Sequence, residues 1–475
     1  MNRTAPESAV AKAKTLFSQG IARHQQEKFA EAQSLYQQVL KLMPQQADAM
    51  HMLGVVEFQL KNYAQAVQLI SCAKSIKPEN DLIHFNLGNA LRAMGQIPAA
   101  SEAFSTALRL RPDHLEALKN LGNTYKEQNL MGEAIACYDR LLAMSPGHPH
   151  TCYNKAIALL TQGQLAEGWD MYEYRLQCDT ADGKHVGHSI PRQAPEWSGN
   201  QPAKPLLVLP EQGLGDQIFY GAMLADLQAA GTESFVCLDG RLHSLFTRSF
   251  PGLDFVLPTE IMGLDPAQQL FGAQIHIASL GRFLRRDTAS LARVPSPYLG
   301  ADPSLANALR QRVRQEAKLI CGLSWSSKNP DTSASKSMTL ATLGPLLQIP
   351  GVQFVDLQYG DTQDERRAIK SNTGIDITHL DDIDNQNDID GLAALIEACD
   401  IVITVSNSTA HLAAALGKPT IILLAHHTPL WYWHLDSMTS PWYPSVTLLR
   451  QPEPGQWHSA VDTAARMLKG VAEII

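Results

Sequence analysis

The feature that most constrains the fold is a 34-residue period in the first third of the chain. Each unit is long enough for two antiparallel helices, with Gly where the helices pack closely and Pro where the second helix ends. Neither helix can bury its apolar face alone, so we expect the units to stack. The recurring positions are Pro44, Pro78, Pro112 and Pro146; Leu53-Gly54, Leu87-Gly88 and Leu121-Gly122; Ala32, Ala66, Ala100 and Ala134; and Tyr36, Ile70, Phe104 and Tyr138.

This period, with these residue types, is the tetratricopeptide repeat pattern. A fifth, degenerate unit runs from about His150 to Arg175, and its aromatic end, Gly168 to Arg175, is expected to seal the solenoid against the next domain. The sequence therefore predicts a repeat domain over residues 1–176. A polar stretch with Gly, Pro and His follows, which predicts a linker over 177–204.

An asparagine also recurs with the 34-residue period, at Asn86, Asn120 and Asn154, while Met52 stands at the matching place of the second repeat. These positions fall on the first helix of each unit, which lines the groove. An amide offers both a donor and an acceptor, so such a series could bind the backbone of an extended peptide without reading its sequence. It resembles the asparagine ladder of O-linked N-acetylglucosamine transferase. The alternative is that these side chains are merely solvated.

The remainder alternates short apolar strands with helices, which predicts parallel α/β sheets. We expect two Rossmann-like α/β lobes, over residues 205–315 and 316–475. The predicted strands are 206–209, 235–239, 255–257 and 274–277 in the first lobe, and 320–325, 354–358, 401–405 and 420–424 in the second.

The stretch around residues 401–424 reads as strand, turn, helix and strand. Its turn, Ser406, Asn407, Ser408 and Thr409, is suited to capping a helix that carries His411. A helix N-terminus at the carboxyl end of a parallel strand exposes N–H groups that favour anions, most often phosphate. An ordinary β-α-β unit that binds nothing is the alternative.

A glycine turn follows the first strand of the first lobe, with Gly213, Gly215 and Asp216. One interpretation is a dinucleotide site with Asp239 as the ribose acid, but Ile218 stands where the third glycine belongs. A second interpretation makes Asp216 a catalytic carboxylate at the mouth of a cleft. A third makes it only a helix cap.

Five stretches carry recognisable motifs: Gly213-Leu214-Gly215-Asp216, Lys336-Ser337-Met338, Leu357-Gln358-Tyr359-Gly360-Asp361, Ala410 to Pro419, and Ser440-Pro441-Trp442-Tyr443-Pro444. Together they resemble the glycosyltransferases of the heptosyltransferase-like group, in the branch fused to tetratricopeptide repeats, some of which modify flagellins. The resemblance implies a GT-B fold, with Asp216 as general base, Lys336 near the donor phosphates, and Ser408, Thr409 and His411 on the diphosphate. Many relatives carry Asp where this chain has Ser406.

The Ser406–Thr409 turn, Lys336, His411 and Gln358 are thus the expected donor-binding residues. We expect no metal and no cofactor besides the nucleotide-sugar substrate. Two Asp-x-Asp pairs, Asp382 with Asp384 and Asp388 with Asp390, lie in a polar loop rather than at the end of an apolar strand. His426-His427 lacks a further ligand at zinc spacing, and Trp431, Trp433, Trp442 and Tyr443 either stack on a ligand or pack in the core.

Composition limits the partners. The formal net charge of -8 argues against nucleic acid or an acidic membrane surface, and the seven cysteines include no C-x-x-C pair. With no apolar leader and no run of transmembrane length, we expect a cytoplasmic protein.

The leading hypothesis is a glycosyltransferase that modifies Ser or Thr of a protein, such as flagellin, held by the repeat groove. A non-catalytic repeat adaptor with a degenerate sugar-nucleotide module is the alternative, kept open by Ser406. An NAD-dependent oxidoreductase would need the missing third glycine.

Overall fold

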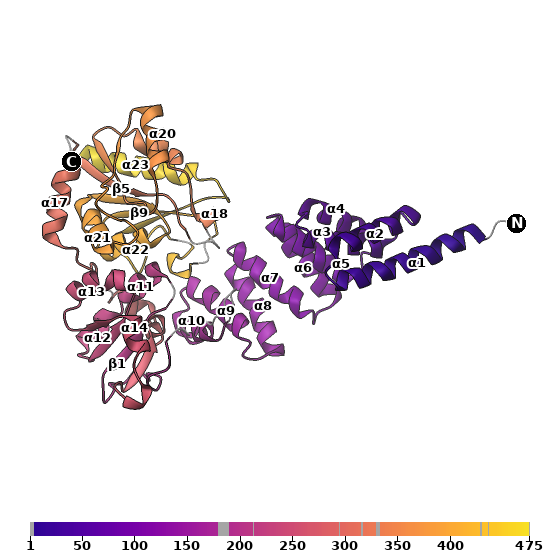
Figure 1. Cartoon of the computed structure of the whole chain (residues 1–475), viewed down its shortest axis with the longest axis horizontal. Helices are drawn as coiled ribbons and strands as arrows, with labels where there is room; N and C mark the ends of the chain where they lie inside the picture. The colour runs from indigo at the N-terminus through magenta and orange to yellow at the C-terminus, as the bar shows by residue number, and fades with distance from the viewer. Residues whose placement is uncertain are drawn as a thin grey trace. The chain divides into compact units, whose positions relative to one another are not determined.

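The computed structural model describes residues 4–178, 190–211, 213–293, 295–314, 317–328, 333–427, 430–435 and 437–474. The chain forms two compact units, Met1–Ala158 and Leu159–Ile475 (Figure 1). The expected linker over 177–204 lies partly outside the described residues. The division between the units falls inside the last helix of the first series rather than at residue 176.

The first unit consists of helix pairs, which confirms the predicted repeats. A Cβ added at Gly54 would lie 2.5 Å from Ile70, and one added at Gly88 would lie 2.6 Å from Phe104. Glycine therefore recurs with the 34-residue period because a larger residue would clash where the two helices of a repeat touch. The helices are α1 (Thr4–Gln25), α2 (Phe29–Leu42), α3 (Ala47–Gln59), α4 (Tyr63–Ile76), α5 (Asp81–Ala93), α6 (Ile97–Leu110), α7 (Leu115–Glu127), α8 (Met131–Met144) and α9 (Pro149–Thr161).

The second unit holds two α/β lobes, as predicted. The first lobe is built on a parallel sheet of strand order β3-β2-β1-β4, which places β1 and its following turn at the centre. Its elements are β1 (Leu206–Leu209), α11 (Leu214–Gly221), α12 (Leu224–Ala229), β2 (Ser234–Cys237), η2 (Gly240–Leu242), α13 (His243–Ser249), β3 (Asp254–Val256), α14 (Pro258–Met262), η3 (Pro266–Gln268), β4 (Ala273–His276), η4 (Ile277–Leu280), α15 (Gly281–Leu284) and α16 (Thr288–Leu291).

The second lobe has a parallel sheet of order β10-β9-β8-β5-β6-β7, with α23 packed against one face (Figure 1). Strand β8 is buried along its whole length, as its β-branched run predicts. The elements are α17 (Pro303–Val313), β5 (Leu319–Ser324), α18 (Ser333–Lys336), η5 (Leu340–Leu343), α19 (Gly344–Leu347), β6 (Val352–Asp356), α20 (Gln363–Thr373), β7 (Ile377–Thr378), α21 (Ile389–Ala398), β8 (Ile401–Val405), α22 (Ser408–Ala415), β9 (Thr420–Leu424), η6 (Trp431–Trp433), β10 (Val446–Arg450) and α23 (His458–Ile474).

The second unit begins with helix α10 (Leu165–Tyr172) and the short η1 (Glu173–Gln177), which the sequence assigned to the fifth repeat. A Cβ added at Gly281 of the first lobe would lie 2.4 Å from the Trp169 ring, so helix α10 lies directly on α15. Arg175 of η1 is fully buried against Glu211, the residue two before the glycine turn. These contacts make the end of the predicted repeat domain a structural part of the first lobe.

Among the helices of the described residues, none combines the length and the apolar character needed to cross a membrane.

Candidate functional site

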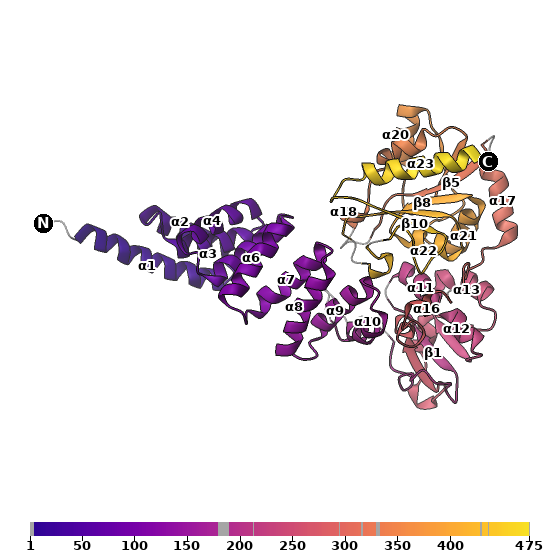
Figure 2. The same cartoon turned by 180° about the vertical axis from the view of Figure 1, so that it is seen from behind.

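The N-termini of α11 and α22 meet where the two lobes face each other, and both figures show the two helices adjacent there (Figures 1 and 2). Each helix follows the carboxyl end of a parallel strand, β1 or β8, which is where α/β sheets bind ligands. A cavity of about 180 Å³ opens between them. It is lined by Gly213, Gly215, Asp216, Ser327, Lys336, Tyr359, Ser406, Asn407, Ser408, His411, Leu430 and Tyr432.

Gly215 permits this approach of the two lobes. A Cβ at this position would lie 3.2 Å from the His411 ring and 3.4 Å from Cα of Ser408. The glycine turn is therefore used for close packing between helix ends. The dinucleotide interpretation is further weakened at Asp239, whose carboxylate is held by its neighbour Arg241 at 2.7 and 2.9 Å.

Asp216 is both a helix cap and a cavity residue. Its Oδ2 atom accepts a hydrogen bond from Gly213 N–H at 3.2 Å, and its carboxylate accepts one from the Tyr432 hydroxyl. Burial raises the pKa of Asp216 to about 6, an effect opposed by the Gly213 N–H and by the charge of Lys336. A carboxylate that titrates near neutral pH is suited to accept a proton from a hydroxyl group.

Lys336 ends α18 and lines the cavity with only 6% of its surface exposed. Burial lowers its pKa, and the charge of Asp216 partly offsets that effect. His411 is buried more deeply, and burial together with Lys336 lowers its pKa to about 3, so its ring is neutral at physiological pH. The Nδ1 atom of His411 lies 3.0 Å from the Tyr443 hydroxyl, and the ring stacks on Trp433. Among the described residues that line the cavity, Lys336 therefore supplies the cationic side chain.

The turn before α22 divides its residues between the cavity and the core. Asn407 caps the helix by accepting from Ala410 N–H at 3.1 Å, and its Nδ2 atom donates to Ser324 Oγ at 2.8 Å. Ser406 Oγ accepts from the Trp433 indole at 2.8 Å. Ser408 reaches the cavity, whereas the Thr409 side chain is fully buried and does not line it.

Gln358 lies apart from this cavity, on a different side of its loop. Its side-chain oxygen accepts from Ser324 Oγ and from the N–H groups of Trp325 and Ser326, at 2.8–3.0 Å, so the amide holds the turn after β5. The residue borders a second, polar cavity of about 400 Å³. That cavity is lined by Gln358, Gly360, His379, Asp381, Ile383, Asp384, Asn385, Gln386 and Asn387.

Four cavity residues were not predicted from the sequence: Ser327, Tyr359, Leu430 and Tyr432. Each lies in a loop or short turn that follows a strand of the second lobe. Their position after β5, β6 and β9 was the available signal, because loops at the carboxyl ends of parallel strands gather at one edge. The other aromatic residues singled out, Trp431, Trp433, Trp442 and Tyr443, are buried, as in the core-packing interpretation.

The acidic pairs take structural positions. Asp388 caps α21 through Gly391 N–H at 2.9 Å, and Asp390 pairs with Arg248 at 2.6 Å. Asp382 pairs with Arg312, and Asp384 accepts from backbone N–H groups of its own turn. Among the described residues, no three His, Cys, Asp or Glu side chains are grouped so that they could hold a metal ion.

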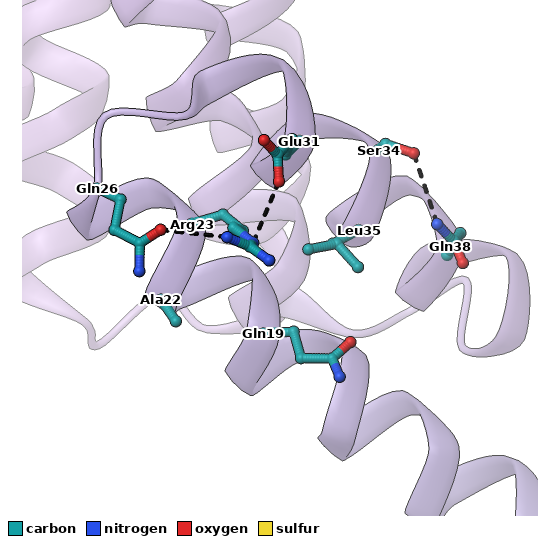
Figure 3. A pocket seen from close by; sticks show the side chains of 8 residues that line it. All are labelled: Gln19, Ala22, Arg23, Gln26, Glu31, Ser34, Leu35 and Gln38. Carbon is teal, nitrogen blue, oxygen red and sulfur yellow. Dashed lines mark hydrogen bonds and ion pairs between the residues drawn. The ribbon is translucent and has the colours of Figure 1, made fainter.

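A hollow of about 560 Å³ lies in the first unit, between α1 and α2 (Figure 3). Arg23 crosses it and pairs with Glu31 at 3.1 Å, while also donating to Gln26 at 3.2 Å. The charged side chains that line this hollow, Arg23 and Glu31, therefore pair with each other, and we propose no ligand for it. The predicted groove asparagines lie elsewhere in this unit, on α5, α7 and α9.

Comparison with known proteins finds similarity in two parts of the chain. Residues 23–84 and 85–149 match tetratricopeptide repeat families, and residues 357–463 match glycosyltransferase family 9 (heptosyltransferase). Protein FlbA of Caulobacter vibrioides is 31% identical over 334 residues, which is 67% of this chain and 55% of FlbA. The chain thus spans little more than half the length of that relative.

Solved structures are similar to part of the chain. The crystal structure of MamA has 20% sequence identity, covers 33% of this chain and 92% of MamA, and gives a TM-score of 0.32. The structure of YrrB, described as a TPR protein with an unusual peptide-binding site, has 20% sequence identity and a TM-score of 0.33. The match covers 36% of this chain and 90% of the YrrB chain.

Proposed function

We propose that this chain, which joins tetratricopeptide repeats to a glycosyltransferase family 9 domain, transfers a sugar from a nucleotide-sugar donor to a Ser or Thr hydroxyl of a protein. The observation that carries the proposal is the meeting of Asp216 and Lys336 in one cavity between two helix N-termini. Asp216 can accept a proton near neutral pH. Lys336 and the N–H groups at the start of α22 line the same cavity and are suited to bind phosphate.

The reaction follows from these groups. The acceptor hydroxyl gives its proton to the Asp216 carboxylate as its oxygen bonds to the anomeric carbon of the sugar. The bond between that carbon and the phosphate oxygen breaks, and the nucleotide leaves as an anion. Lys336 and the N–H groups at the start of α22 stabilise the negative charge that develops on the phosphate.

The second cavity suits the nucleoside end of the donor. Tyr359 lines the first cavity while Gln358 and Gly360 line the second, so the two spaces lie on either side of one short loop. Amide and carboxylate groups, including Asn387 and Asp384, offer partners for ribose hydroxyls and base edges. This placement leaves the sugar beside Asp216.

We propose a metal-independent GT-B reaction, because Lys336 and the N–H groups at the start of α22 can stabilise the phosphate charge that a metal ion would otherwise stabilise. Transfer should therefore continue at full rate in EDTA. The measurement is product formation with and without EDTA and added manganese. Loss of activity in EDTA, with recovery in manganese, would contradict the prediction.

Lys336→Ala should weaken donor binding by about 1.5–3 kcal/mol, the loss expected for a charge-assisted bond to phosphate. This corresponds to roughly a 10- to 150-fold rise in Kd. Isothermal titration calorimetry on both proteins measures the change. Lys370→Ala is the matched control, because Lys370 lies in the same lobe and pairs with Asp376 at the surface. Equal affinity of wild type and Lys336→Ala would remove the lysine from the donor site.

The test of the function has two stages. Thermal shifts are first measured with UDP-, GDP-, ADP- and CMP-sugars, since a ligand of the native state raises its melting temperature. The stabilising donor is then incubated with candidate acceptors, flagellin first on the family resemblance, and intact masses are compared. A mass increase of one sugar supports transfer. A donor that binds but is never transferred or hydrolysed would favour the non-catalytic adaptor, in which Ser406 replaces the Asp of many relatives.

A further inference from the structure

Hydrogen bonds join the first helices of successive pairs in the first unit. Asn86 Nδ2 donates to His51 Nε2 at 2.8 Å, and Asn120 Nδ2 donates to Asn89 Oδ1 at 2.8 Å. Lys126 Nζ donates to Asn154 Oδ1 at 2.6 Å. These bonds connect α3 to α5, α5 to α7, and α7 to α9. We define the amide face as Asn86, Asn89, Asn120, Asn123, Lys126 and Asn154.

The amide face has two kinds of asparagine. Asn86 and Asn120 use their Nδ2 atoms within the protein, so their oxygens are available as acceptors. Asn89 and Asn123, also 34 residues apart, do the reverse: their oxygens accept from Asn120 and from the Tyr138 hydroxyl at 2.9 Å, which leaves their Nδ2 donors. A peptide backbone also offers one donor and one acceptor at every residue. The face therefore matches an extended main chain.

Asn154 differs from the other predicted groove residues. Its Oδ1 accepts from Lys126, and its Nδ2 donates to the backbone oxygen of His150 at 2.9 Å. Both ends of this amide are in use, so Asn154 serves to position Lys126. The predicted three-member series is thus replaced by two donor–acceptor pairs and a lysine.

Lys126 lacks a carboxylate partner of its own among the described residues. The carboxylate of its neighbour Glu127 is bound by Arg92 through Nε at 3.1 Å, which leaves Lys126 with the neutral Asn154 amide. Burial lowers the pKa of Lys126 to about 8. A carboxylate placed here would form a charge-assisted bond and offset the cost of the half-buried cation.

A small hollow of about 170 Å³ lies at the other end of the face, between α3 and α5. Val55, Phe58 and Ile70 give it an apolar floor, and Gln59, Asn86 and Asn89 complete its lining. An aliphatic side chain fits such a space. The hollow and the Lys126–Asn154 contact are two helix intervals apart, about 16–20 Å, which an extended chain spans in about five or six residues.

We propose that the amide face binds an extended protein segment with an aliphatic and an acidic side chain about five or six residues apart. The aliphatic side chain fills the hollow, the main chain lies along the asparagine pairs, and the acidic side chain meets Lys126. The identification of this segment as part of the acceptor substrate rests on the proposed function; its binding does not.

The test is binding of fluorescent peptides to the full chain, without donor. A peptide series varies the spacing between one Leu and one Glu, and each member has a Gln counterpart. Affinity should peak at the predicted spacing, and Glu→Gln should cost wild type about tenfold or more. Lys126→Met should bind both peptides alike, whereas Lys126→Arg should restore the preference. Lys119→Met is the control, because this lysine of α7 pairs with Glu116 on its own helix.

A Glu→Gln loss that is the same in wild type and Lys126→Met would overturn the assignment of Lys126, and a lack of binding at every spacing would overturn the whole face. Donor hydrolysis is measured on the same protein samples. Peptide binding without any sugar turnover would reject the proposed function and support this inference. Sugar turnover without peptide binding would support the proposed function and reject this inference.

Discussion

Asp216→Asn should yield a folded protein that binds donor normally but turns over about 10²- to 10⁴-fold more slowly, the usual contribution of a general base. The asparagine oxygen can still accept from Gly213 N–H, as the carboxylate does at 3.2 Å, so the turn keeps its cap. The amide cannot accept the acceptor's proton. Steady-state kinetics with intact-mass detection, together with donor calorimetry, separates the two effects. Weakened donor binding in parallel with lost turnover would indicate a structural role instead.

The pH profile provides an independent check. Because burial raises the pKa of Asp216 to about 6, the carboxyl is protonated below that pH and cannot act as a base. In wild type, kcat/KM should fall as pH decreases through about 6 and be level above it. Asp239→Asn is the matched control, since it removes a carboxylate of the same lobe that pairs with Arg241 outside both cavities. It should keep the wild-type profile. A flat wild-type profile across this range would reject Asp216 as the base.

Arg175→Met should destabilise the second unit by about 3–5 kcal/mol, the cost of leaving one partner of a buried ion pair alone. Arg175 Nε and one terminal nitrogen bind both oxygens of Glu211 at 2.7 and 2.6 Å, and the side chains are 1% and 0% exposed. The same guanidinium donates to Ser279, and Glu211 accepts from Ala278 N–H. Removing the Arg175 guanidinium therefore leaves the buried Glu211 carboxylate with one N–H donor, that of Ala278, in place of three.

The double variant Arg175→Met, Glu211→Leu should recover much of that loss, because no charge is then stranded. Arg286→Met is the control: it breaks an exposed pair with Asp170 and should cost no more than about 1 kcal/mol. Denaturant midpoints followed by tryptophan fluorescence provide the measurement. If Arg175→Met and Arg286→Met shift the midpoint equally, the buried pair does not stabilise the fold.

The repeats and the sheets were predictable because their signals are local and recurrent. Gly54 and Gly88 repeat because each meets one bulky side chain, Ile70 or Phe104, at the same contact. The sequence placed the Asp216 turn and the α22 cap directly after apolar strands, while the role of Asp216 as a base came from the family resemblance. Both segments line one cavity because each follows the carboxyl end of a parallel strand, which is where α/β sheets bind ligands.

The position of the remaining site residues could not be predicted, because it depends on tertiary contacts that leave no repeating pattern in the sequence. Tyr432 and Leu430 reach the cavity from an irregular segment after β9. Thr409 looked equivalent to Ser408, but one residue of helix rotation turns it into the core, where it is 0% exposed. Gln358 was expected at the donor. Its side-chain oxygen accepts from three donors of the turn after β5, and the residue borders the second cavity, where we propose that the nucleoside binds.

The burial of Arg175 against Glu211 has a consequence for recombining such proteins. A chimera that replaces the chain up to residue 176 would also replace Arg175, and the buried Glu211 carboxylate would then lose its cation unless the new sequence supplied one. The exchangeable portion ends within α9, before Leu159, where the compact units divide. Arrays grafted upstream of that point leave α10 and η1 with the lobe that they contact, so Arg175 keeps its place against Glu211.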